Sequence, residues 1–562
     1  MIAAVASYVY PVFEYRRCAD HGLTRRAHHP VVVVGGGMVG LTAALDLAQR
    51  GVRVVVIDDD ATVSTGSRSI CQAKRSLEIW DRLGCAEPMM AKGVTWQVGR
   101  VFWRDREVYK FDLLPGGGQR FPAFINLQQY YVEQFLVERL QETRGVELRW
   151  KNKLIGLVPR ADCVCLTIET PDGPYEIEAD WVIAADGARS TARRLLGLDF
   201  KGRVFEDRFL IADIRMDTPP FGRTGPTERL FWFDPPFHKG DSALLHRQAD
   251  NVYRVDFQLG PTADPDLERQ PERVIPRLRA MLGDDAKFDC EWLSVYTFQC
   301  RRLDRFRHGR VIFAGDAAHQ VSPFGARGGN SGIQDADNLC WKLALVMEGL
   351  APERLLDSYD EERGHAADEN VLITTRSVDF MTPRGATTRA FRDAVLKLAA
   401  THPFARRLVN SGRLSVATAL AASSLNTPDE PGFAPAMAPG TAAIDAPVRI
   451  GNRAGWLLEM LRGGFQALYF AGAPLPPPHA AALRELRTAP VPVHVLAIVG
   501  PAAASVPDMP TIVDAEGLVA KRYDARPGTC YLFRPDQHVL ARWRRFDPGM
   551  IATALHRAVG HA

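Results

Sequence analysis

Three glycines and an aspartate near the start of the chain have the clearest chemical potential. Gly35, Gly37 and Gly40 are spaced as GxGxxG, after a run of four valines and at the start of an apolar helical pattern. In this arrangement the glycines permit a tight turn, the approach of a pyrophosphate and close helix–strand packing, while the helix start attracts phosphates. Asp58 ends the next apolar strand, where an acid binds a ribose hydroxyl. The expected nucleotide contacts are Gly35, Gly37, Met38, Val39, Gly40 and Asp58.

Two later pairs of adjacent residues, one Asp–Gly and one Gly–Asp, indicate which dinucleotide is bound. Asp186-Gly187 and Gly315-Asp316 each follow an apolar run typical of a buried strand. Ligands of open α/β sheets bind beyond the carboxyl ends of the strands. An aspartate there can accept hydrogen bonds from polyol hydroxyls, which a ribityl chain offers and a nicotinamide riboside does not. No second GxGxxG follows a strand, so the sequence favours FAD without a separate nicotinamide domain.

With the GxGxxG, DG and GD motifs in this order and spacing, the sequence resembles the p-hydroxybenzoate hydroxylase family of FAD-dependent aromatic monooxygenases. The resemblance covers roughly residues 30–430 and extends to SPFGARGGN at 322–330, a loop that lies beside the isoalloxazine in that family. The resemblance also implies that a glutamine of one helix contacts FAD. Because Gln128 and Gln129 are adjacent, the sequence leaves open which of the two makes this contact. The further FAD contacts that the resemblance implies are Arg68, Gln129, Asp186, Gly187, Gly315, Asp316, Pro323, Gly328, Gly329 and Asn330.

The resemblance also implies a reaction. In this family NADH or NADPH visits the FAD domain transiently and reduces FAD, and O₂ then forms a flavin C4a-hydroperoxide that hydroxylates a phenolate. The expectation is an NAD(P)H-dependent aromatic hydroxylase of a small phenolic compound, with the choice between NADH and NADPH left open. Two alternatives remain. One is a monooxygenase of a polyketide or antibiotic substrate, and the other is a non-catalytic FAD-fold binding protein, which would have no use for Gly315-Asp316.

The substrate is expected to meet aromatic strands between the DG and GD motifs. Residues 201–299 include alternating, aromatic-rich runs, which suit a flat apolar pocket. The Ser-x-Arg carboxylate clamp of p-hydroxybenzoate hydroxylase is not reproduced at 246–248, and no tyrosine occupies 231–237, which argues against a benzoate. Histidine titrates near neutrality and tyrosine can relay a proton. The candidate catalytic residues are His246, His238 and Tyr296, with Pro323 in the loop that the family places beside the reacting hydroxyl.

The elements that must position these residues predict an α/β protein. It combines a Rossmann-like FAD-binding domain of the p-hydroxybenzoate hydroxylase type with an inserted β-sheet substrate domain. The chain after 440 resembles the thioredoxin-like domain of the branch with 3-(3-hydroxyphenyl)propionate hydroxylase and pentachlorophenol monooxygenase. Cys530 has no CxxC partner, so a structural or dimer-related role is expected there. The predicted divisions are a leader at 1–29, the FAD-binding domain at 30–200 and 300–345, the substrate domain at 201–299 with 94–113 paired to it, a helical segment at 346–426, a linker at 427–440 and the thioredoxin-like domain at 441–562.

Composition excludes several classes of protein. Lys and Arg total 69 against 66 Asp and Glu, which leaves no nucleic-acid footprint. No run of about 18 apolar residues is present, so no membrane span is expected. The nine cysteines form no CxxC, and Cys163 and Cys165 alternate with apolar residues as a buried strand would. The expectation is a cytoplasmic homodimer with reduced thiols and no metal site.

Overall fold

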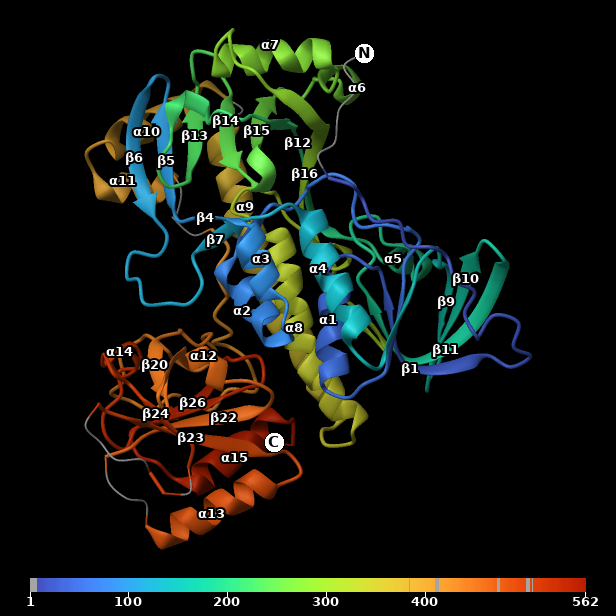
Figure 1. The fold of residues 1–562 in the computed structure, drawn as a ribbon, viewed down its shortest axis with the longest axis vertical. Helices are drawn as coiled ribbons and strands as arrows, with labels where there is room; N and C mark the ends of the chain where they lie inside the picture. The colour runs from blue at the N-terminus through green and yellow to red at the C-terminus, as the bar shows by residue number, and fades with distance from the viewer. Residues whose placement is uncertain are drawn as a thin grey trace.

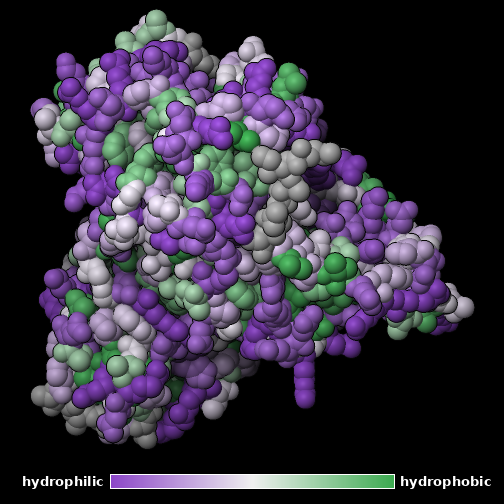
Figure 2. All heavy atoms as spheres, turned by 45° about the horizontal axis from the view of Figure 1, so that its top comes forward, coloured by the Kyte–Doolittle hydropathy of each residue, from purple (hydrophilic) through white to green (hydrophobic). Residues whose placement is uncertain are grey.

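The computed structural model describes residues 8–383, 385–409, 414–472, 476–501, 506–507 and 509–561. Figure 1 shows three bodies: a parallel sheet with its helices at the middle and right, a second sheet above it, and the C-terminal body below. The face in Figure 2 is largely hydrophilic, with apolar groups in small scattered patches, because the apolar side chains fill several separate cores. None of the helices in these ranges is long and apolar enough to cross a membrane.

The dinucleotide unit folds as its apolar pattern predicts. Strand β1 (Ala27–Val34) pairs in parallel with β2 (Val54–Ile57) and with β11 (Gly173–Ala184), and α1 (Met38–Gln49) connects β1 to β2. The valines of β1 are buried, as expected of a parallel strand covered on both faces. The strand order is β17-β18-β11-β1-β2-β8, so three strand ends far apart in sequence meet at one edge. The remaining strands are β8 (Val146–Arg149), β9 (Lys153–Pro159), β10 (Val164–Thr170), β17 (Arg307–His308) and β18 (Val311–Phe313).

Helices α2 (Lys74–Leu83), α4 (Gln129–Glu142) and α8 (Gly328–Met347) pack around this sheet (Figure 1). Residues expected as a leader are part of the same body, since β1 already starts at Ala27. The segment before it packs too, with the Phe13 ring stacked on Trp150 at 4.4 Å between centroids. Residues 1–7 lie outside the described chain.

The second sheet has eight strands in the order β19-β16-β12-β15-β14-β13-β5-β6. Strand β5 enters it from the N-terminal part of the chain and pairs in parallel with β13. Helix α7 (Pro271–Leu282) covers one face, and α9 (Asp357–Met381), α10 (Ala386–Ala399) and α11 (Pro403–Val409) pack on the other side. The strands are β5 (Val98–Trp103), β6 (Arg106–Asp112), β12 (Lys201–Arg215), β13 (Glu228–Phe233), β14 (Ser242–Arg247), β15 (Val252–Leu259), β16 (Asp289–Arg302) and β19 (His319–Gln320).

Two expected divisions differ from the structure. Strand β4 (Val94–Trp96) pairs with β7 (Phe124–Asn126) in a separate three-stranded sheet that also contains β3 (Cys71–Ala73), because the Trp96 indole donates a 2.8 Å hydrogen bond to Asn126. Only the later part of 94–113 therefore joins the second sheet. The segment 427–440 is no free linker either, since the Thr427 amide donates to the Leu540 carbonyl and Asp429 pairs with Arg542.

The C-terminal body is a seven-stranded sheet with a thioredoxin-like centre. Its strand order includes β23-β22-β25-β26, in which β22 and β23 are parallel and β25 and β26 run antiparallel to their neighbours. Cys530 on β25 is fully buried, and burial raises the pKa of its thiol far above the ordinary value, which disfavours the reactive thiolate. The elements are β20 (Pro447–Ile450), β21 (Arg453–Trp456), α12 (Leu457–Met460), β22 (Phe465–Phe470), α13 (Pro477–Thr488), β23 (Val493–Val499), β24 (Thr511–Val513), α14 (Leu518–Arg522), β25 (Cys530–Phe533), β26 (Val539–Trp543) and α15 (Pro548–Ala558).

Candidate active site

A cavity of about 490 Å³ lies where the dinucleotide sheet meets the second sheet. One side of it consists of the strand ends of β1, β11 and β18, the start of α1 and the loop before α8. The other side consists of side chains from β12 to β16. The cavity is thus continuous from the glycine turn to the aromatic sheet face.

The glycine turn has the features that a pyrophosphate requires. Gly35 has φ +110°, and an added Cβ would lie 2.5 Å from the Ala185 carbonyl, so no other residue fits. Gly40 packs directly against the Gly35 carbonyl, which brings α1 close to β1. No side chain caps the start of α1 at Gly37, so its first N–H groups are free to meet a phosphate. Gly37, Met38 and Val39 line the cavity, as predicted.

Asp58 lines the cavity from the end of β2. Its carboxylate accepts hydrogen bonds from the amides of Gly36 at 2.5 Å and Asp60 at 2.8 Å. Burial raises its pKa to about 6, although these two amides lower it. The acid therefore holds the glycine turn in place as well as facing the nucleotide end of the cavity.

Asp186 and Asp316 differ in the hydrogen bonds that their carboxylates make within the protein. The Asp186 carboxylate accepts from Ser190 Oγ at 2.6 Å and from the Ala192 amide at 2.9 Å, so it also caps the short helix α5 (Thr191–Leu195). Asp316 has no side-chain hydrogen bond or ion pair with any residue that the structure describes, and burial raises its pKa. A buried carboxylate of this kind retains its full capacity to accept hydrogen bonds from a ligand.

Most of the remaining predicted FAD contacts reach the cavity. Gln129 does so, with its Oε1 accepting from the Ser69 amide at 3.2 Å. Gln128 does not line the cavity, because its side chain donates to the Ala249 carbonyl. Asn330 does not line the cavity, because its amide joins α8 to the Cys71 carbonyl and the Ala73 amide. Gly315, with φ +62°, packs against Val39 instead. The predicted residues that line the cavity here are Arg68, Gln129, Asp186, Gly187, Asp316, Pro323, Gly328 and Gly329.

Two of the three candidates for handling the phenolic proton face the cavity. His246 on β14 and Tyr296 on β16 line it, but His238 does not. The His238 ring lies against Phe257, and its Nε2 makes a 2.6 Å hydrogen bond with the Gln258 carbonyl. His238 thus lies outside the cavity in this structure, because the turn after β13 directs it behind the sheet.

Burial sets the protonation of both cavity residues. The pKa of His246 is lowered well below its ordinary value, by burial and by the positive charges of Arg229 and Arg254, so its imidazole is neutral at pH 7. Its Nε2 lies 3.9 Å from Asp256 Oδ2, and its Nδ1 has no partner among the described residues. Burial raises the pKa of Tyr296 to about 12, with a further contribution from Asp316.

Several cavity residues were not identified from the sequence. They share one property, which is that they alternate along strands whose other residues face α7 and its core. Period-two alternation was visible in the sequence, but the face of each strand that meets the cavity depends on the register of the sheet. The additional lining residues on this sheet are Phe209, Ile211, Arg229, Leu244, Arg254, Asp256, Trp292 and Ser294.

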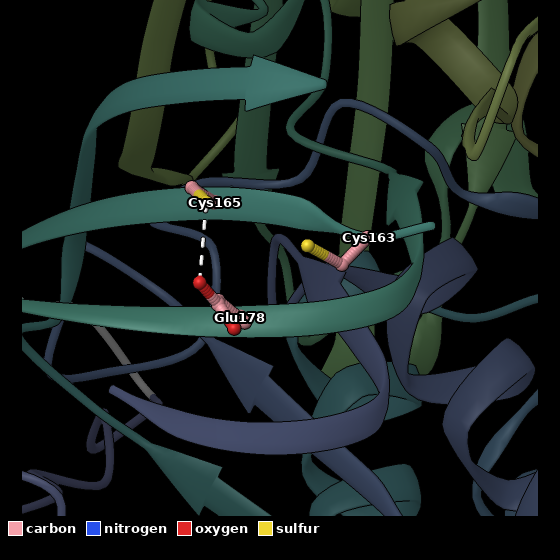
Figure 3. Close-up of side chains that lie close together, drawn as sticks. All are labelled: Cys163, Cys165 and Glu178. Carbon is pink, nitrogen blue, oxygen red and sulfur yellow. Dashed lines mark hydrogen bonds between the residues drawn. The ribbon is translucent and has the colours of Figure 1, made fainter. Parts of the chain in front are cut away.

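Cys163 and Cys165, noted in the sequence, do not line this cavity. Figure 3 shows Cys163 and Cys165 near Glu178 of the neighbouring strand, and the Cys165 thiol donates to its carboxylate at 3.6 Å. Their ligand atoms all lie within 4.8 Å of one another. Arg26 and Arg160 already pair with this carboxylate at 3.4 and 3.8 Å, so its charge is balanced without an ion.

Comparisons with known proteins agree with this geometry. A family model described as the FAD binding domain matches residues 28–374. The chain is 30% identical over 379 residues to the 3-(3-hydroxy-phenyl)propionate/3-hydroxycinnamic acid hydroxylase of Mycolicibacterium smegmatis, covering 67% of this chain and 66% of that protein. It is 36% identical over 341 residues to the 6-methylpretetramide 4-monooxygenase of Streptomyces rimosus, covering 59% and 58%.

A solved structure extends the likeness to the C-terminal body. The flavin-dependent monooxygenase PieE, in complex with FAD and substrate, has a TM-score of 0.80 to this chain at 24% identity. The alignment covers 95% of this chain and 99% of that one, so the two share the fold of all three bodies.

Proposed function

This chain belongs to the FAD binding domain family of flavin-dependent monooxygenases, and we propose that it hydroxylates a phenolic ring with bound FAD, O₂ and NADH or NADPH. The predicted family, fold class and enzyme type are thereby confirmed. The observation that carries the proposal is the continuity of the cavity from the glycine turn to the aromatic sheet face. A flavin held at one end would meet a ring held at the other.

The residues at the dinucleotide end fit FAD. An added Cβ at Gly37, Gly187 or Gly328 would meet no atom closer than 3.5 Å, so the backbone there leaves room for a ligand. The unpartnered Asp316 carboxylate suits the ribityl hydroxyls, and the uncapped start of α1 suits the pyrophosphate. When bound, FAD supplies the acceptor for the nicotinamide hydride and the activation of O₂.

The protein's own side chains would then prepare the ring. Phe209, Leu244 and Phe298 provide buried apolar contacts that exclude water from the reacting atoms. The neutral His246 can accept the phenolic proton at its free Nδ1, while its Nε2 faces the Asp256 carboxylate. Tyr296 is protonated at neutral pH and can donate a hydrogen bond to the substrate oxygen.

A larger phenolic substrate is the second candidate. The Streptomyces rimosus relative is named for a 6-methylpretetramide. A further cavity of about 50 Å³ is lined by Arg229, Phe324 and Arg327, which also line the main one. A fused-ring phenol could use both spaces, whereas a single ring needs only the first.

The proposed location is the cytoplasm, which all nine cysteines support by being free thiols. The test of function is purification followed by a screen of phenols for stimulated NADH or NADPH consumption, with product analysis to exclude release of peroxide. The expected protein is yellow and releases FAD on denaturation. A colourless protein that takes up no added FAD would refute the proposal.

A further inference from the structure

Arg229 on β13 is an unpaired cation inside the cavity. Its Nε is inaccessible to solvent, and its guanidinium has no hydrogen bond or ion pair with any residue that the structure describes. Burial lowers its pKa from the ordinary value, although Cys71 and Asp256 raise it. A partly buried charge without a partner is unfavourable, so a fold tolerates it where a ligand supplies the missing charge.

The other cation that the second sheet contributes to the cavity is already engaged. Arg254 forms a bidentate pair with Asp213, with Nε–Oδ1 and Nη2–Oδ2 both at 2.8 Å. Arg327 donates to Asn370 Oδ1 at 2.9 Å. Arg68 lies at the dinucleotide end, where it interacts electrostatically with Asp316. Among the described residues, Arg229 is thus the cavity-lining cation of the second sheet that has no carboxylate or amide partner.

The surroundings of Arg229 leave room for an anion. Asp256 influences it electrostatically but lies beyond 4.0 Å, the limit of an ion pair, and is shared with Arg254 and His246. Arg229 also lines both the main cavity and the smaller one. A ligand oxygen can therefore approach its guanidinium from a space that no protein carboxylate occupies, and a guanidinium binds such an oxygen group in bidentate fashion.

We propose that Arg229 binds an anionic oxygen group of the substrate, so that this enzyme binds the ionised form of an aromatic compound in preference to its neutral form. This inference rests on the proposed function, because it places the substrate ring in the same cavity. The anionic oxygen has two possible sources, a carboxylate on a side chain of the ring or the ionised phenol itself. In either case the anion is bound from β13, and not from residues 246–248, where the Ser-x-Arg motif is not reproduced.

The test uses the oxidised, FAD-loaded enzyme, because ligand binding near a flavin changes its visible absorbance without turnover. The probes are 3-(3-hydroxyphenyl)propionate and its primary amide, which differ in charge but hardly in shape. The acid is expected to bind more tightly than the amide, and Arg229→Gln is expected to weaken binding of the acid about 10- to 100-fold while changing the amide less than about twofold. Arg229→Lys should recover part of the loss, and Lys110→Gln, which removes an exposed charge from β6 of the same sheet, should change neither.

The source of the charge follows from the pH profile. A preference for the acid already present at pH 6 identifies the carboxylate. If the acid and the amide bind equally at pH 6, the pH dependence decides. An affinity for both that rises as pH passes the pKa of the phenol, in the native enzyme but not in Arg229→Gln, identifies the phenolate. The absence of both effects, or the same effects in Arg229→Gln, would overturn the inference.

The failure of the proposed function would look different. If Arg229→Gln weakens binding of the acid but the native enzyme forms no hydroxylated product, the function is refuted and the anion site stands. Hydroxylation of the acid with equal efficiency in the native and Arg229→Gln enzymes would leave the function standing and refute the anion site.

Discussion

Glu362 on α9 and Arg534 after β25 form a buried ion pair, with Nη1 2.5 Å from Oε1, although 172 positions separate them in the chain. Lys342 on α8 also donates to this carboxylate at 2.7 Å, and Arg534 pairs with Asp536 at 2.5 Å. All four side chains are almost fully buried. The C-terminal body is therefore joined to the helices behind the cavity by an internal ion network and not by a flexible tether.

Removal of Glu362 should be strongly destabilising. Glu362→Ala leaves Lys342 and Arg534 buried with less compensating charge, and we expect a loss of about 3–5 kcal/mol in the free energy of unfolding. The measurement is chemical denaturation followed by fluorescence. The matched control is Glu361→Ala, which removes an exposed carboxylate one position earlier on the same helix. Equal losses in the two variants would show that the network contributes nothing.

Asp335 should make stability depend on acid pH. Burial would raise its pKa, but the charges of His319 and Arg363 outweigh this effect and lower the pKa from 3.8 to about 2. A depressed folded pKa gives stability that is present above pH 4 and lost as pH falls from about 4 to 2, an amount of about 2 kcal/mol. In Asp335→Asn this part of the pH dependence should be missing. An unchanged slope between pH 4 and 2 would contradict the assignment.

Asp316 should be needed for cofactor retention but not for folding. Asp316→Ala removes the free acceptor at the cavity, and we expect FAD affinity to fall by about 1–3 kcal/mol, or roughly 5- to 150-fold. Because the carboxylate has no partner in the described protein, the apoprotein should be as stable as before or more so. Asp186→Ala is the contrasting variant, since it also removes the cap of α5 and should destabilise the apoprotein. Unaltered FAD affinity in Asp316→Ala would remove it from the proposed site.

Asp256 should tune the binding of acidic ligands. Burial raises its pKa to about 6, Arg254 and Arg229 lower it, and Asp213 raises it; His246 faces it from β14. Below pH 6 its negative charge is lost, so an aromatic carboxylate that stays ionised should bind more tightly at pH 5.5 than at pH 7.5. Asp256→Asn should bind equally at both values. A ligand affinity that falls on acidification in the native enzyme would contradict this charge arrangement.

Substitution of His246 and substitution of His238 should have different effects on the hydroxylation rate. His246→Gln removes the proposed proton acceptor, and we expect the hydroxylation rate to fall by about 10²- to 10⁴-fold with flavin reduction by NADH or NADPH retained. His238→Gln lies outside the cavity and should leave hydroxylation within about twofold. Rapid-mixing measurement of the two half-reactions provides the comparison. If His238→Gln proved the more damaging, the histidine assignment would be reversed.

The sequence by itself determined the dinucleotide end of the site. Gly35, Gly37 and Asp58 are specified by short-range requirements, namely a positive φ, an open backbone and an acid at a strand end, which a linear pattern records directly. Asp186 and Asp316 followed from the same rule, because the carboxyl ends of parallel strands meet at one edge of a sheet. The thioredoxin-like tail was predicted from its resemblance to a branch of the family, and the fold confirms it.

Only the tertiary structure decided which side chains of the second sheet face the cavity. His246 and His238 looked equivalent in sequence, and Arg229 attracted no notice, because alternation defines two faces of a strand but does not say which one is inside. For Arg229, the face of β13 that lies inside depends on the pairing of β13 with β5, whose residues lie more than a hundred positions away. The pairing of Glu362 with Arg534 was invisible for the same reason. Both depend on contacts between distant segments, and those contacts follow from the packing free energy of the whole chain and not from any local pattern.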